Sequence, residues 1–165
     1  MTPDDKTTEK KQPEAEPIKK SEDFDVDDET RADIEDRLKA YFTDDEKVRQ
    51  IRDEALAAIA KGKKDHPKRT IFLVTLPENP YPFICRSSSF NEAIKFASAA
   101  EKTKSGRMLS ASAAAYVSTH VLYPRITVDA VTGGSELIND GDGVRLFSAI
   151  QDKSGGSENV EVKNV

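Results

Sequence analysis

The sequence predicts an α+β domain, in which a small β-hairpin packs with a mostly helical C-terminal body. Two short apolar runs at 71–74 and 83–86 flank a proline-containing turn, as expected of a hairpin. Apolar residues recur at helical spacing before and after these runs. From shifts in composition we expect four segments: a disordered acidic arm at 1–28, N-terminal helices at 29–62, the α+β body at 70–153 and a flexible tail at 154–165.

The arm is predicted from its charge and its lack of apolar side chains. Residues 1–30 contain eleven Asp or Glu and five Lys, a net charge of −6, whereas the whole chain has a net charge of −5. So few apolar side chains cannot offset the entropy that the backbone loses when it orders. The rest of the chain is nearly neutral and lacks the basic face typical of nucleic-acid binding, so we expect no nucleic-acid partner.

Two helices are predicted within 29–62. The first follows the spacing of Ile34, Leu38, Tyr41 and Phe42, and the second that of Val48, Ile51, Ala55 and Ile59. Thr43 and Glu46 have the spacing of a capping box for the second helix, and Gly62 is its expected end. The sequence leaves open whether the two helices are antiparallel or nearly continuous. The basic stretch 61–69 (KGKKDHPKR) could contact phosphate, but we favour cations at a helix C-terminus followed by a polar loop that exposes His66.

A continuous apolar run such as 71–74 is typical of a strand that is covered on both faces. Pro77 and Pro80 interrupt the run because proline cannot donate to a strand ladder. Cys85, in the second run, is expected to be a buried and unreactive thiol. A single cysteine excludes an internal disulfide and fits a reducing compartment.

Three further helices are predicted in the C-terminal body. Ser89 and Glu92 have the spacing of a capping box that opens the first. The Ala-rich stretch 108–122 is expected to be the most buried helix, with His120 as a core residue or a partner of the helix dipole. A brief strand is expected at 126–128. The last helix follows Val144, Phe147 and Ile150, with Asp142 as its N-cap.

No motif in the sequence indicates catalysis or metal binding. Residues 139–143 (NDGDG) resemble the start of a calcium loop, but Val144 and Gln151 occupy positions that require oxygen ligands. The serines at 87–89 lack the glycine elbow of a hydrolase. We expect no enzyme activity, metal or cofactor. A hydrolase or nuclease with a site assembled from distant residues is the remaining enzymatic alternative.

The order of several short motifs carries a family resemblance. A Lys-rich helix end (AIAKGKKDHPKR) precedes an apolar strand (TIFLVTL) and a second strand that ends in arginine (PFICR). A helix with an acidic first turn follows (SSSFNEAIKFASAAEK), then the stretch YVSTHVLYP and a glycine-preceded last helix (GVRLFSAIQDKSGG). In this order, over residues 47–155, the chain resembles the tail assembly chaperones of long-tailed bacteriophages.

The resemblance implies a non-enzymatic protein that binds the phage tape-measure protein and promotes assembly of the tail-tube protein around it. Such chaperones act in the host cell cytoplasm and are usually absent from the mature virion. Self-association is a further expectation. No apolar run is long enough to span a membrane, so we expect no membrane partner. The acidic arm departs from the family's pattern and leaves open a small structural virion protein, such as an adaptor or decoration subunit with a flexible arm.

Tape-measure proteins are long, helical and apolar on one face, so a chaperone needs an exposed apolar groove or helix face. We expect such contact on the helices that follow the hairpin. The residues expected to bind a partner are Phe90, Ile94, Phe96, Tyr116, Val117 and Val121. The alternative is that all of them belong to the core, and for any single one of these residues we favour the core.

Overall fold

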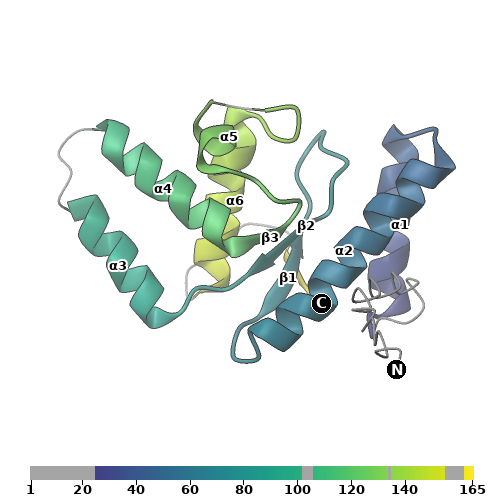
Figure 1. Ribbon diagram of the computed structural model, residues 1–165, viewed down its shortest axis with the longest axis horizontal. Coiled ribbons are helices and arrows are strands. Elements are labelled where there is room, and N and C mark those ends of the chain that lie inside the picture. The colour runs from purple at the N-terminus through teal and green to yellow at the C-terminus, as the bar shows by residue number, and fades with distance from the viewer. Residues whose placement is uncertain (1–24, 102–105, 134, 155–161) are drawn as a thin grey trace, which may run out of the picture.

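A four-stranded antiparallel sheet lies between two groups of helices, which makes the fold α+β as predicted (Figure 1). The structure is a computed structural model and describes residues 25–101, 106–133, 135–154 and 162–165. The helices are α1 (Asp28–Tyr41), α2 (Asp45–Asp65), α3 (Phe90–Glu101), α4 (Gly106–His120), α5 (Val128–Gly133) and α6 (Asp140–Lys153). The strands are β1 (Ile71–Val74), β2 (Phe83–Arg86), β3 (Val121–Tyr123) and β4 (Val162–Asn164).

The hairpin of β1 and β2 forms the centre of the sheet, whose strand order is β3-β2-β1-β4. Every residue of β1 and β2 is buried. Successive side chains of a strand point to opposite faces, so Phe72 and Cys85 enter one apolar core whereas Leu73 and Ile84 enter the other. This two-sided burial confirms the covered strand that the continuous apolar run predicted. Cys85 is buried as expected, and burial raises the pKa of its thiol.

Helices α1 and α2 cover one face of the sheet. They pack against each other after a short connection, so the chain reverses between them and the helices are not continuous (Figure 1). Asp44, not Thr43, caps α2: its Oδ1 accepts from the backbone N–H groups of Glu46 at 3.0 Å and Lys47 at 3.4 Å. The predicted Thr43–Glu46 capping box is therefore wrong. A carboxylate competes well for this position because it also meets the positive end of the helix dipole.

Helices α4, α5 and α6 cover the opposite face (Figure 1). The helix predicted to reach residue 122 ends at His120, and the next three residues form β3 beside β2. The strand expected at 126–128 is not formed, because Val121–Tyr123 already satisfies the free edge of β2 and Val128 begins α5. Local apolar content alone could not distinguish these two short runs.

The expected flexible tail at 154–165 is wrong at its end, because Val162–Asn164 pairs with β1 as β4. Pairing supplies hydrogen-bond partners to an edge of β1 that would otherwise be open. Residues 155–161 lie outside the described residues. So do residues 1–24, which include most of the predicted arm, although Val26 is buried in the α1–α2 core.

The β1–β2 turn is held by both groups of helices. Arg37 of α1 donates from Nε to the carbonyl oxygen of Asn79 at 3.0 Å and contacts the Leu76 carbonyl through Nη2. On the other side, Asn79 Nδ2 donates to the Leu137 carbonyl, in the loop before α6, at 2.7 Å and to Asp142 Oδ2 of α6 at 3.3 Å. Glu78, between these anchors, has a positive φ of 57°, a conformation that side-chain-bearing residues rarely adopt.

Candidate functional site

Helix α3 begins where β2 ends and lies beside α4, away from α1 and α2 (Figure 1). The predicted capping box is confirmed. Ser89 Oγ accepts from the Glu92 backbone N–H at 3.1 Å, and Glu92 Oε1 accepts from the Ser89 N–H at 3.1 Å. This arrangement fixes the Glu92 side chain at the junction between the sheet and the α3–α4 pair.

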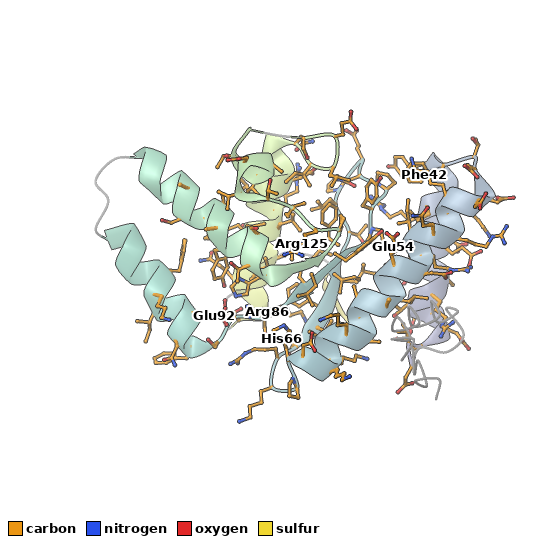
Figure 2. All side chains as sticks on the ribbon, in the orientation of Figure 1. Phe42, Glu54, His66, Arg86, Glu92 and Arg125 are labelled. Atoms are coloured by element: carbon orange, nitrogen blue, oxygen red, sulfur yellow. The ribbon has the colours of Figure 1, made fainter. Side chains whose placement is uncertain are left out.

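A polar cluster fills this junction; we call its members Arg86, Ser88, Glu92, Tyr116 and His120 the junction cluster. Arg86 donates to both carboxylate oxygens of Glu92, at 3.0 and 2.9 Å, and Figure 2 shows the two side chains facing each other. The hydrogen bonds from Arg86 lower the pKa of Glu92 to about 2. The carboxylate is therefore ionised and balances the charge of the buried guanidinium.

His120 is 1% exposed at the centre of the junction cluster. Its Nδ1 lies 2.7 Å from the carbonyl oxygen of Tyr116, which can only accept, so Nδ1 carries the proton. Nε2 then accepts from the hydroxyl of Ser88 at 2.9 Å, and Ser88 Oγ in turn contacts the Tyr116 hydroxyl. Burial lowers the pKa of His120, which agrees with a neutral ring.

The junction cluster brings together a serine, a histidine and an acid, but not in the order of a catalytic triad. In a triad the acid holds Nδ1 while Nε2 faces the serine. Here the Tyr116 carbonyl occupies Nδ1, and Glu92 Oε2 lies 3.2 Å from the same Nε2 that faces Ser88. The backbone N–H of buried Ser88 donates to Ser154 Oγ at 2.7 Å, so it is not available to an oxyanion. This geometry supports a structural junction of β2, α3, α4 and α6.

Sequence reasoning missed the junction cluster, because His120 lies far along the chain from Ser88 and Glu92. The capping box placed Glu92 correctly, and Arg86 ends the predicted strand. No spacing rule connects this pair to the C-terminal end of a later helix. Only the packing of α4 across the end of β2 brings the histidine to them.

The predicted partner-binding residues divide into exposed and buried groups. Phe90 and Ile94 are 79% and 46% exposed on α3. The ring of Phe96 packs against Phe147, with centroids 5.2 Å apart, and against Tyr116 at 5.1 Å. Three members of the prediction are corrected, since Tyr116, Val117 and Val121 are buried in the core and do not offer a surface. Tyr116 and Val117 are buried because α4 packs on both α5 and α6, and Val121 is buried because it lies in β3 beside β2.

An apolar pocket opens between α4, α5 and α6, and we call it the α4–α6 pocket. Its volume is about 280 Å³. The lining residues are Ala113, Ala114, Val117, Val131, Thr132, Gly143, Val144 and Phe147. Val144, in the first turns of α6, is 66% exposed. The sequence predicted Val144 as part of an apolar helix face, but it could not predict that none of the described elements covers this end of the face.

The calcium-like stretch at 139–143 forms the start of α6. Asn139 is the N-cap, and its Oδ1 accepts from the Asp142 N–H at 2.9 Å. Asp142 was expected to be the N-cap itself; instead its Oδ2 accepts from the Asn139 N–H at 3.1 Å, which completes a capping box. Asparagine and aspartate are equally good N-caps, so the sequence could not separate them. Within the described ranges, no three His, Cys, Asp or Glu side chains are grouped as metal ligands.

No helix in the described part of the chain combines the length and apolar character needed to cross a membrane. Comparison with known proteins finds no matching family model, no similar curated protein and no similar solved structure.

Proposed function

We propose that this chain is a non-enzymatic binding protein that holds an apolar-faced helix of a long partner, and that it acts as a tail assembly chaperone of a long-tailed bacteriophage. The partner is then the tape-measure protein, around which the tail-tube protein assembles in the host cell cytoplasm. The resemblance of motif order supplies the class. The α4–α6 pocket is the observation that carries the binding role.

The α4–α6 pocket suits an amphipathic helix for two reasons. Apart from that of Thr132, the side chains that line it are apolar, so a large apolar side chain that enters the pocket leaves water for mainly apolar neighbours. Helical partners bind grooves through apolar anchors spaced three or four residues apart. Val144 on α6 and the small side chains Ala113 and Ala114 on α4 would let a helix backbone approach closely.

Exposed apolar side chains on α3 offer a second contact. Phe90 and Ile94 are four positions apart, so they lie on one side of the helix. Water-exposed phenylalanine is costly in a protein that stays dispersed, and clusters of such residues commonly mark binding surfaces. A long partner could contact the pocket and α3 at separate points along its length.

The test is co-expression of tagged protein with the tape-measure and tail-tube proteins of one phage, followed by affinity purification and mass spectrometry. We expect both proteins to be recovered. Val144→Glu places a charge at the rim of the α4–α6 pocket and should reduce recovery of the tape-measure protein several-fold. Tyr41→Gln, which removes an exposed aromatic ring from α1, is the matched control and should leave recovery unchanged.

Two results would contradict the proposal. Recovery of the wild-type chain alone and monodisperse would exclude a tape-measure chaperone. Stoichiometric amounts of the chain in purified particles would instead indicate the structural virion protein. Full recovery with Val144→Glu would leave the partner in place but exclude the pocket as its site.

A further inference from the structure

Helix α3 lies at the outside of the molecule, beside α4 (Figure 1). The structure describes the exposure of its first seven residues, 90–96. Five of them are exposed, and the other two, Glu92 and Phe96, are partly buried. These two residues are four positions apart and therefore lie on the same side of the helix. The attachment of this part of α3 to the rest of the fold thus depends on one carboxylate and one aromatic ring.

Glu92 attaches α3 to the sheet. Both of its carboxylate oxygens accept hydrogen bonds from the guanidinium of Arg86, at 3.0 and 2.9 Å. Arg86 is buried and ends β2, one of the two central strands. Within residues 90–96, no side chain besides Glu92 forms an ion pair with a residue that the structure describes. We call the paired side chains the Arg86–Glu92 latch.

Phe96 attaches α3 to two other helices. The centroid of its ring lies 5.1 Å from that of Tyr116 on α4 and 5.2 Å from that of Phe147 on α6. The Tyr116 and Phe147 rings also contact each other, with centroids 5.5 Å apart. Phe147 in turn lines the α4–α6 pocket. Phe96 therefore covers rings that continue directly into the pocket, and its departure would extend the apolar surface from the pocket across Phe147 to Tyr116.

We propose that α3 is a detachable strap. It leaves α4 as a unit, while the sheet and the other described helices stay folded, and it uncovers Tyr116 and Phe147 beside the α4–α6 pocket. Elements with few buried side chains open at a lower free energy than the core does. An isolated helix of 12 residues is marginal in water, so α3 unfolds once it has left α4.

Opening of the strap changes the surface that a ligand can meet. A ligand that binds the uncovered rings has affinity for the open state, so its binding shifts the equilibrium toward that state. The closed state is held by the Arg86–Glu92 latch and by Phe96, so loss of either contact should raise the open population. The proposal concerns the chain by itself and does not depend on the proposed function.

The test is amide hydrogen exchange of the full chain, labelled with ¹⁵N and followed by NMR. The α3 amides from Ala93 onward should exchange about a hundredfold faster than those of β1, relative to their intrinsic rates, because β1 opens only with the whole fold. Glu92→Gln should accelerate α3 exchange about tenfold more, since Arg86 loses a charged partner. A glutamine at this position can still accept from the Ser89 N–H, so the cap of α3 is retained.

A substitution in the other core separates local from global opening. Ile59 is fully buried in the core beneath α1 and α2. Ile59→Val should therefore accelerate β1 exchange about twofold to tenfold and leave α3 exchange unchanged. Acceleration of α3 and β1 by the same factor would show that α3 opens only with the whole fold and would overturn the proposal. Equal exchange of α3 and β1 in the wild type would overturn it too.

Lys95→Gln is the matched control for the latch. It removes a charge from an exposed position of α3 that forms no ion pair with any described residue. Its α3 exchange should match that of the wild type. Equal acceleration of α3 by Lys95→Gln and Glu92→Gln, or no acceleration by Glu92→Gln, would show that the Arg86–Glu92 latch does not hold the strap.

Discussion

Single residues of the junction cluster connect four elements, and their charges make stability depend on pH. Arg86 is buried and keeps its charge, so it depends on the Glu92 carboxylate as its counterion. His120 is buried as a neutral ring, and its Nε2 accepts a hydrogen bond from the Ser88 hydroxyl. Removal of one member therefore leaves another buried polar group without its hydrogen-bond partner. Such a group has lost its contacts with water and gains none in return, so the substitution lowers stability.

Glu92→Gln should lower the free energy of unfolding by about 1–3 kcal/mol, because Arg86 loses its counterion. The pKa of Glu92 is depressed to about 2 in the folded chain, so its contribution is present above the unfolded value and is lost as pH falls from about 4 to 2. Urea unfolding between pH 5 and 2 should show a shallower pH dependence in the variant. Glu46→Gln, at an exposed first-turn position of α2, is the control and should keep the wild-type slope.

His120 has the opposite pH effect in a different range. Burial lowers its pKa, so the unfolded chain binds a proton more readily than the folded chain. Stability should therefore fall as pH falls through the unfolded value of about 6.5. His120→Gln should remove this dependence of the free energy of unfolding on pH between pH 7.5 and 5.5, even if the variant is less stable overall. The control, His66→Gln, should show the same pH dependence as the wild type. If His120→Gln also kept the wild-type pH dependence, His120 would not be the buried neutral histidine responsible for it.

At the scale of elements, a glycine sets the distance between α2 and the sheet. A Cβ atom at Gly62 would lie 2.7 Å from Leu122 Cδ1 and 3.2 Å from Ile71 Cδ1. Gly62→Ala should therefore destabilise the fold by up to about 2 kcal/mol, since overpacking of about 1–3 kcal/mol outweighs the gain of about 1 kcal/mol in helix propensity. Thermal unfolding measures the change. Gly141→Ala, whose Cβ would meet the mobile end of Arg145 at 3.0 Å, should show little loss.

Strand β4 protects the edge of β1. It pairs Phe72 with Asn164 and Val74 with Val162, and Val165 donates to the Ile71 carbonyl at 3.2 Å. Removal of residues 162–165 should accelerate hydrogen exchange of the β1 amides by tenfold or more and promote association through the open edge. Mass-spectrometric exchange and light scattering report these two effects. Unchanged exchange in β1 would show that β4 contributes nothing to the sheet.

Prediction from sequence succeeded where the pattern is local. The buried hairpin, the Ser89–Glu92 capping box and the helical periodicity of α1, α2 and α6 all follow from spacing of a few residues. It failed where distant segments decide. Val121–Tyr123 forms a strand because it pairs with the free edge of β2. Val162–Asn164 forms a strand because it pairs with the free edge of β1. In the candidate site, Phe90 and Ile94 were proposed as partner-binding residues and are exposed, whereas the junction cluster and the α4–α6 pocket depend on how α4 packs against the sheet and α6.

At the scale of the whole molecule, one sheet joins two apolar cores. Leu56 lies in the core beneath α1 and α2, and Leu146 lies in the core beneath α4 and α6; both are fully buried. Leu→Ala at either position should lower the free energy of unfolding by about 2–5 kcal/mol. Because β1 and β2 contribute side chains to both cores, each variant should unfold in one transition. Circular dichroism and tyrosine fluorescence should give coincident curves, and two separate transitions would show that the cores fold independently.

The position of β4 in the sheet also affects how the protein can fold during its synthesis. The ribosome completes β1 roughly ninety residues before it makes the segment that pairs with it, and such distant pairing is slow to form. The α1–α2 layer and the hairpin can associate during this interval, but one side of β1 remains without a partner. A nascent chain of this protein is therefore exposed to mispairing at β1 until residues 162–164 are made, and chaperones that shield strand edges would act on it during that interval.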